Sequence, residues 1–139
     1  MSNKLKKDKG NSTIKADKAK GSRNNDLVLM SIKNVQYRFE CFSNWTAQEM
    51  TKFWKFNQKL HESTWAQVYE TSSKGKDKRG FALTYIDRKK YSAIPFIQDL
   101  SDEIRIFELR VDDTIRVHGF RVDSIFYLCL LDRTHRICP

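Results

Sequence analysis

Residues 108–139 read ELRVDDTIRVHGFRVDSIFYLCLLDRTHRICP. Three runs in and just before this stretch, RIFELRV, TIRVHGFRV and SIFYLCLLD, have the apolar patterns of β-strands. Asp112-Asp113 and Asp123-Ser124 separate the runs and predict tight turns between antiparallel neighbours. The last run is apolar on both faces, which predicts a strand with neighbours on either side. The end of the chain therefore predicts a β-meander.

A strand and a helix are predicted upstream of this meander. Residues 35–43, VQYRFECFS, alternate apolar and polar side chains, which indicates a strand with one buried face. Thr46 and Glu49 have the spacing of a capping box and mark the start of a helix. Apolar residues then recur at helical spacing, so we expect Trp54 and Leu60 to face the sheet.

The middle of the chain contains shorter elements. A second helical stripe restarts near Ser63, and residues 71–80 have the composition of a basic loop. Residues 81–86 alternate again and predict a short strand, whereas residues 92–102, with Pro95, predict an irregular segment. This order predicts an α+β fold, in which one helix or a helix pair packs on one face of an antiparallel sheet meander.

Charge is distributed unevenly along the 139 residues, whose formal net charge is +9. Residues 1–26 hold eight Lys and Arg against three Asp, and contain no aromatic residue. Such a segment buries too little apolar surface to offset its ordering entropy, so we expect a disordered basic tail. Residues 27–139 contain every Trp, Tyr and Phe, and they are predicted to form one α+β domain.

The sequence also argues against several classes of protein. No run approaches the roughly 20 apolar residues of a membrane span, and the N-terminus lacks the apolar core of a signal peptide. We therefore expect a cytoplasmic protein that does not bind a membrane. Its three cysteines are widely spaced and contain no CxxC pair, which argues against a disulfide framework or a cysteine zinc site. We expect no metal and no cofactor.

Arginine recurs through the C-terminal strands. The positions are Arg110, Arg116, Arg121, Arg133 and Arg136. Guanidinium groups suit phosphate, because their planar fork grips two oxygens and their charge does not titrate. A basic sheet face could therefore follow a phosphodiester backbone, with His118 or His135 as an acid or base near neutrality. Arginines on an exposed sheet face paired with neighbouring carboxylates are the ordinary alternative.

The side of the sheet on which Arg121 lies depends on one glycine. Strict alternation places Arg121 opposite Arg116 and His118. A bulge at Gly119 would bring Arg121 to the same side as the other two.

The strand–helix–meander order resembles the RelE/ParE-like toxin superfamily and its phage-derived relatives. That family typically reads L-R-(v/l)-x-x-x-y-R-v, followed by a hydrophobic strand and a basic or His-containing terminus. The resemblance covers about residues 35–139 and is best over residues 105–139. By position, Leu109-Arg110 matches the first motif pair, and Arg116 matches the later arginine.

The resemblance implies the toxin of a toxin–antitoxin system, which acts on RNA or the ribosome as an endoribonuclease and binds a cognate antitoxin protein. It implies these catalytic residues: Arg116, Arg133 and His135. The RNA-binding residues predicted beside them are Arg110, Arg121, Lys89 and Lys90.

Two departures from the family pattern leave other functions open. Glu108 stands where RelE-type nucleases prefer a lysine, and the chain closes with Cys138-Pro139 in place of a late tyrosine, whose role His135 could take. A ParE-type inhibitor of a DNA topoisomerase keeps the sheet arginines without that tyrosine. A non-catalytic interaction module of phage or mobile-element origin is the second alternative.

Overall fold

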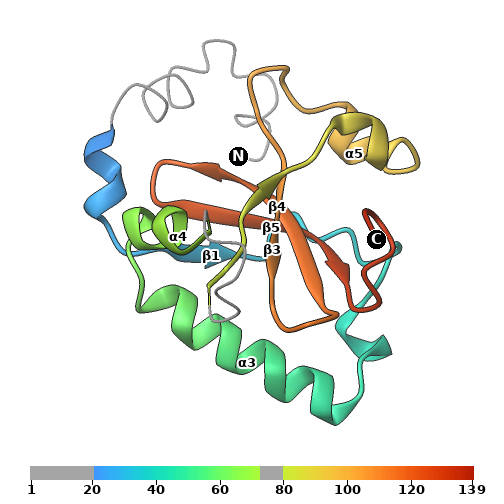
Figure 1. Cartoon of the computed structure of the whole chain (residues 1–139). Coiled ribbons are helices and arrows are strands. Elements are labelled where there is room, and N and C mark those ends of the chain that lie inside the picture. The colour runs from blue at the N-terminus through green and yellow to red at the C-terminus, as the bar shows by residue number, and fades with distance from the viewer. Residues whose placement is uncertain (1–20, 73–79) are drawn as a thin grey trace.

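The computed structural model describes residues 21–72 and 80–139. Within them, the strands form one sheet in the order β1-β5-β4-β3-β2 (Figure 1). The strands are β1 (Leu29–Ser31), β2 (Thr84–Tyr85), β3 (Phe107–Arg110), β4 (Arg116–Val122) and β5 (Ile125–Asp132). The helices are α3 (Ala47–His61), α4 (Trp65–Ser72) and α5 (Pro95–Gln98), with 3₁₀ helices η1 (Gly21–Asn25), η2 (Phe42–Asn44) and η3 (Arg88–Tyr91).

The strands β2 to β5 are antiparallel neighbours, as the sequence predicts. Asp112 fixes the β3–β4 turn, because its Oδ1 accepts hydrogen bonds from the backbone N–H groups of Thr114 at 2.9 Å and Ile115 at 2.6 Å. At the β4–β5 turn, Asp123 has a φ of 57°, in the left-handed region that Asp enters more readily than most residues. Strand β5 lies between β1 and β4. The predicted α+β class is therefore confirmed.

The first strand is not where the sequence predicts it. Residues 35–43 form turns and the start of a 3₁₀ helix, and the edge strand is instead β1, which runs parallel to β5. Burial gives the reason, because Tyr37 is 62% exposed whereas Glu40 is buried. The Glu40 carboxylate accepts hydrogen bonds from Trp45 Nε1 at 2.6 Å and from the Arg133 backbone N–H at 3.0 Å. The alternating pattern predicts the reverse, with Tyr37 buried and Glu40 exposed.

Helix α3 begins at the predicted residue. The capping box is closed by Glu49 N–H donating to Thr46 Oγ1 at 3.1 Å and Thr46 N–H donating to Glu49 Oε1 at 2.8 Å. Leu60 is fully buried, as predicted, but Trp54 is 57% exposed, so the prediction that it faces the sheet is wrong. Neighbouring helical residues point about 100° apart, and Phe53 takes the buried position instead.

Helices α3 and α4 cover one face of the sheet (Figure 1). Helix α4 begins at Trp65, close to the predicted restart near Ser63. Trp65 and Phe53 pack with Phe107 and Val117 of the strands in one apolar core. This layer matches the predicted helix pair on one face.

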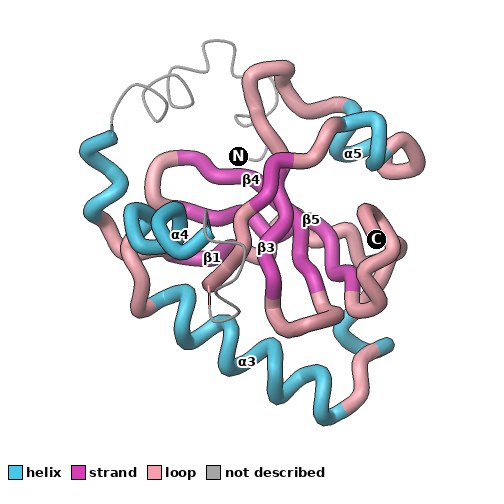
Figure 2. Tube along the Cα trace, in the orientation of Figure 1, coloured by secondary structure: helices cyan, strands magenta, loops and turns pink. Residues whose placement is uncertain are grey.

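The opposite face of the sheet is also largely covered. Residues 88–106, which include η3 and α5, contribute Tyr91 and Ile97 to a second core with Phe120 and Leu130 of the sheet (Figure 2). Apart from one end, this face is therefore not the exposed sheet surface that alternation in residues 105–111 and 114–122 predicts. Charged side chains remain on this face at one end of the sheet.

The β4–β5 pairing contains a bulge between His118 and Gly119, at the predicted glycine. The extra residue is Cys129 of β5, so β4 keeps its strict alternation. Arg121 consequently lies on the helix-covered face, and the expectation that the bulge brings it beside Arg116 is wrong. A Cβ at Gly119 would overlap the backbone of β5, which accounts for glycine at this position.

The described part of the chain begins inside the predicted tail. Residues 1–20 of that tail and residues 73–79 of the predicted basic loop lie outside the described residues. Residues 21–25 form η1, and Asn24 Oδ1 accepts a hydrogen bond from Arg121 at 2.7 Å. The domain boundary predicted after residue 26 is therefore too late in the chain. No helix in the described ranges has both the length and the apolar character that a bilayer span needs.

Candidate active site

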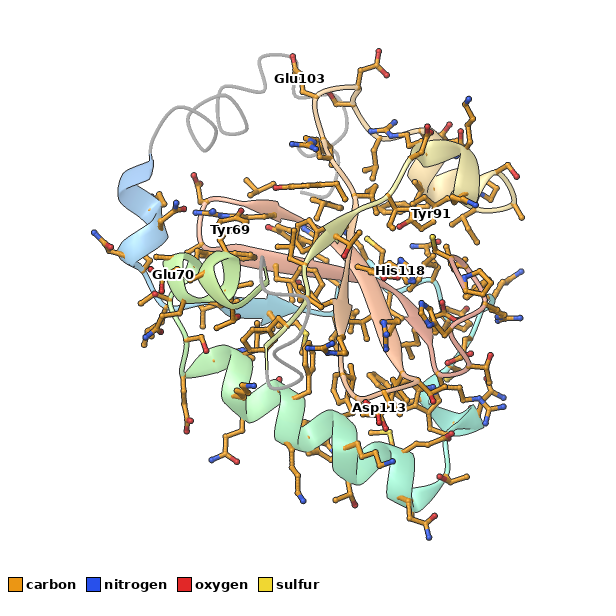
Figure 3. The ribbon with its side chains drawn as sticks, viewed as in Figure 1. Tyr69, Glu70, Tyr91, Glu103, Asp113 and His118 are labelled. Atoms are coloured by element: carbon orange, nitrogen blue, oxygen red, sulfur yellow. The ribbon has the colours of Figure 1, made fainter. Side chains whose placement is uncertain are left out.

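The charged end of the second face is built where β3, β4 and β5 meet the C-terminal segment. Strand register places Glu108 beside His118 and Arg116 between Arg110 and Asp132. The sequence that follows β5 turns back over these strands (Figure 3), and Tyr91 reaches the same place from η3. The cluster is therefore assembled from five elements: three strands, the C-terminal segment and η3.

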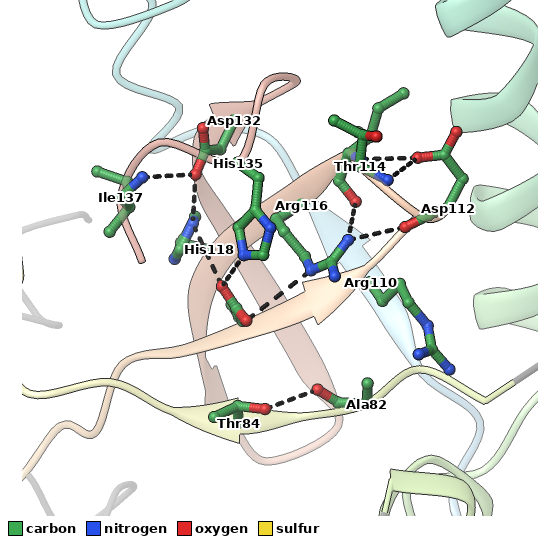
Figure 4. A network of polar contacts seen from close by, with 12 residues as sticks. Ala82, Thr84, Arg110, Asp112, Thr114, Arg116, His118, Asp132, His135 and Ile137 are labelled. Carbon is green, nitrogen blue, oxygen red and sulfur yellow. Dashed lines mark hydrogen bonds and ion pairs between the residues drawn. The ribbon is translucent and has the colours of Figure 1, made fainter. Parts of the chain in front are cut away.

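Glu108 is the centre of the cluster (Figure 4). Its Oε2 lies 3.9 Å from Arg116 Nε, and its Oε1 lies 3.8 Å from His135 Nε2 and 3.9 Å from His118 Nε2. The Glu108 side chain is 11% exposed. One largely buried carboxylate thus faces a guanidinium and two imidazoles.

Arg116 is held in place by the backbone of the β3–β4 turn. Its Nη1 donates to the carbonyl oxygens of Asp112 at 2.7 Å and Ile115 at 3.2 Å. Burial lowers the pKa of Arg116, and the neighbouring Glu108 carboxylate opposes that shift. The direction of the guanidinium is therefore set by fixed acceptors, and its Nε faces Glu108.

Behind Glu108 lies a fully buried chain of three polar groups. His118 Nε2 lies 3.2 Å from Asp132 Oδ2, and His118 Nδ1 lies 2.9 Å from the Tyr91 hydroxyl. A neutral imidazole satisfies both contacts when Nε2–H donates to the carboxylate and the Tyr91 hydroxyl donates to Nδ1. Burial raises the pKa of Tyr91, so its hydroxyl keeps its proton. These three hydrogen-bonded side chains form the fixed floor of the site.

Asp132 also shapes the segment that carries His135. Its Oδ1 accepts the backbone N–H of Arg136 at 2.8 Å, and its Oδ2 accepts that of Ile137 at 3.0 Å. Burial alone would raise the pKa of Asp132, but the His118 hydrogen bond and these two N–H groups outweigh burial and lower it. The turn gives His135 a φ of 57°, in the left-handed region, and directs its ring toward Glu108.

The atoms of Glu108 and His135 that face each other make no hydrogen bond to any described residue. Glu108 Oε1 and His135 Nε2 are both buried and make no hydrogen bond in the described part of the chain. Unpaired buried polar atoms cost free energy, and they recur at sites with a ligand or a reaction. A carboxylate, an imidazole and a guanidinium can act as base, acid and charge stabiliser in the transesterification of a phosphodiester. Among residues 21–72 and 80–139, no group of His, Cys, Asp and Glu is arranged to hold a metal ion.

The structure brings together two of the three predicted catalytic residues. Arg116 and His135 both approach Glu108. Arg133 contacts other groups, because its Nη1 lies 3.5 Å from Glu49 Oε1 and its backbone N–H donates to Glu40. Arg133 therefore faces the start of α3.

The residues predicted to bind RNA are spread over three places. Arg110 lies at the end of β3, with its Nη2 donating to Gly80 O at 3.0 Å. Lys89 and Lys90 are exposed on η3. Arg121 lies on the helix-covered face, 4.5 Å from the centre of the Trp65 ring. Arg121 therefore lies away from Arg116, whereas Arg110 is the neighbour of Arg116 across β3 and β4.

The sequence prediction missed Glu108, Asp132 and Tyr91 as members of this site. A signal for Glu108 was present, because it shares a strand face with Arg110 and alternates with buried Leu109. Nothing local marks Tyr91, whose contact with His118 spans 27 residues of sequence.

The comparisons with known proteins found a likeness in fold alone. No family model matches the sequence, and no curated protein matches it. The fold resembles a chain in the crystal structure of the archaeal RelE–RelB complex from Pyrococcus horikoshii OT3, with a TM-score of 0.44 and 12% identity. The match covers 79% of this chain and 98% of the other. The RelE-like resemblance is thus also found by structure, but at these values it assigns neither activity nor partner.

Proposed function

We propose that this chain is an RNA-directed toxin that cleaves RNA by transesterification without a metal ion. The observation that carries the proposal is the approach of Arg116 and His135 to the two oxygens of one carboxylate, Glu108, at 3.9 and 3.8 Å. This arrangement supports the roles of base for Glu108, acid for His135 and charge stabiliser for Arg116. The resemblance in the sequence to RelE-type toxins adds the cellular setting, which is a toxin paired with a cognate antitoxin protein and acting on RNA or the ribosome.

In the proposed reaction, Glu108 removes the proton of a ribose 2′-OH, and the oxygen attacks the adjacent phosphorus. The bond from phosphorus to O5′ breaks, and protonated His135 gives its proton to O5′. The products are a 2′,3′-cyclic phosphate and a free 5′-OH. General acid–base catalysis of this kind contributes about 10²–10⁴-fold. Arg116 stabilises the phosphorane charge, and losing one such donor costs about 10²–10³-fold in rate.

RNA must separate Glu108 from His135 before reaction. A gap of 3.8 Å between Glu108 Oε1 and His135 Nε2 leaves no space for a phosphate group. His135 lies in the short segment after β5, which Asp132 anchors. Movement of this segment would open the site and expose both reacting atoms.

The proposal is tested by inducing the wild-type protein, Arg116→Lys and Arg116→Ala at equal abundance. Lysine keeps the charge but loses the planar fork, so both variants should lose most of the activity. Arg38→Lys is the matched control, because Arg38 is an exposed arginine outside the cluster. The measurements are growth arrest and the mapping of new mRNA 5′ ends that carry a hydroxyl.

A second candidate function is a non-catalytic interaction module, and the contact between Glu108 and His135 favours it because the contact leaves no space for a phosphate group. In such a module, the two side chains would only maintain the local structure. In that case, Arg116→Lys would act as the wild type does, and no new mRNA ends would appear. Growth arrest without new ends would instead favour the inhibition of another target, such as a DNA topoisomerase.

A further inference from the structure

A groove of about 430 Å³ lies beside the catalytic cluster, between α3 and the β3–β4 turn. Four basic side chains line it, and Asp112 and Asp113 are the acidic residues at its β3–β4 end. Lys52, Lys55 and Lys59 come from α3, and Arg110 comes from β3. The sequence analysis did not predict a binding role for any of these three lysines.

The three lysines follow one side of α3. Lys52, Lys55 and Lys59 have the i, i+3, i+7 spacing that aligns residues on one helix face. At 1.5 Å of rise per residue, the row extends about 10 Å, which is longer than a single phosphate group. The row therefore suits an extended polyanion better than a small anion.

The floor of the groove is apolar but closed. Phe56 and Phe81 line the groove, yet they are only 4% and 3% exposed. Lys59 Nζ lies 5.0 Å from the centre of the Phe81 ring and covers it. Because neither aromatic face is open for stacking, the groove offers charge to a backbone and no surface that reads bases.

Asp112 contacts both a lysine of the groove and Arg116 of the cluster. Its carboxylate lies 2.9 Å from Lys52 Nζ, and its carbonyl oxygen accepts the 2.7 Å hydrogen bond from Arg116. Arg110 and Arg116 are direct neighbours across β3 and β4. A strand bound at Arg116 would therefore meet Arg110 and then the lysine row.

We infer that this groove binds the phosphate backbone of the RNA strand next to the cleaved linkage, without regard to sequence. The inference rests on the proposed function, because the cluster at Arg116 defines where the strand begins. A change at Lys52 would also remove its ion pair with Asp112 of the β3–β4 turn. The variants are therefore made at Lys55 and Lys59.

The test measures the dissociation constant of a 2′-O-methyl RNA oligonucleotide over a range of salt concentrations. This probe has no 2′-OH and is not cleaved, so binding is measured apart from catalysis. Lys55→Ala and Lys55→Ala/Lys59→Ala should each weaken binding, and the salt slope should fall by about 0.7 for each phosphate that the variant no longer neutralises. With cleavable RNA, KM should rise while kcat stays constant. Lys33→Ala, at an exposed lysine just after β1, is the control.

The outcomes separate the groove from the proposed reaction. If the double variant binds with the same affinity and salt slope as Lys33→Ala, and melts at the wild-type temperature, the inference is wrong. If a glutamate-rich peptide binds more tightly than the oligonucleotide, with the same dependence on Lys55, the groove is a protein-docking surface and the inference is also wrong. If lysine-dependent binding holds but the wild type does not cleave RNA, the groove stands and the proposed function fails.

Discussion

The two faces of the sheet differ in the residues that the same strands contribute to them. On the helix-covered face, Phe107 and Leu109 of β3 are buried in an apolar core. On the other face of the same strand, Glu108 lies in the charged cluster, and Arg110, at the end of the strand, also lines the groove beside α3. Strand alternation therefore supplies both a core and a site from consecutive residues.

The two faces should contribute differently to the free energy of unfolding. Burial of apolar surface stabilises the helix-covered face, whereas buried charges must first recover their desolvation cost. Glu108 and Asp132 are buried carboxylates, and Glu108 Oε1 does not recover that cost with a hydrogen bond in the described part of the chain. We attribute the charged end to function and the apolar face to folding. Substitutions on the two faces should separate these contributions.

The largest expected effect on stability is at Leu60, in the middle of the helix-covered face. Leu60→Ala leaves a cavity at a fully buried site and should lower the free energy of unfolding by roughly 2–5 kcal/mol. Urea denaturation of the two proteins measures the difference. A loss below about 0.5 kcal/mol would show that α3 does not pack on the sheet as described.

The next effect is expected at Asp132, on the charged face. Asp132→Asn removes the buried carboxylate that accepts hydrogen bonds from His118 and from two backbone N–H groups, and it should cost about 1.5–3 kcal/mol near neutral pH. The pKa of Asp132 is lowered in the folded protein below its usual 3.8, so its stabilisation is present above that value. The stabilisation is lost as the pH falls through the folded-state pKa. Thermal melts from pH 7 to pH 2 should show this acid-dependent loss in the wild type and a weaker one in the variant.

A smaller effect is expected at Arg121, whose guanidinium joins the domain to η1. Arg121→Met removes hydrogen bonds to Asn24 and Tyr69 and the contact with the Trp65 ring. The cost should be about 1–2 kcal/mol by chemical denaturation. RNA binding should stay at the wild-type level, because Arg121 lies on the face opposite Arg116. A variant with unchanged stability and weakened RNA binding would reverse this assignment.

The smallest effect is expected at Trp54. Its side chain is 57% exposed although its neighbour Phe53 is buried. Trp54→Ala should change the free energy of unfolding by no more than about 0.5 kcal/mol, as is usual for surface substitutions. Calorimetry alongside Leu60→Ala gives the comparison within one helix. A loss similar to that of Leu60→Ala would mean that the helix register is rotated.

The sequence predicts the elements whose signals are local. The capping box at Thr46, the turns at Asp112 and Asp123 and the bulge at Gly119 all depend on nearby residues, and all are found. The strand predicted over residues 35–43 failed because a distant partner, Arg133, draws Glu40 inward. The short β1 could not be found from three residues, since its pairing with β5 is non-local.

The site was partly predictable for the same reason. Arg116 and His135 were predicted as site residues from residue type and from the resemblance to RelE-type toxins, and both lie beside Glu108. Their shared neighbour Glu108 became apparent only when the register of β3 and β4 and the C-terminal turn were known. Arg121 was misplaced because the extra residue of the bulge is in β5, and a glycine in β4 does not reveal on which strand it lies.

The most direct test of the assigned roles compares two RNAs, one ordinary and one with sulfur replacing O5′ at the cleaved phosphate. A thiolate leaves without protonation, so the sulfur substrate needs a base but no acid. The account predicts that His135→Ala slows cleavage of ordinary RNA by about 10²–10⁴-fold and regains most of the wild-type rate on the sulfur substrate. Glu108→Gln should be slow on both RNAs. The account would be contradicted if both single variants cleaved ordinary RNA at the wild-type rate. It would also be contradicted if the sulfur substrate restored the rate of Glu108→Gln as well as that of His135→Ala.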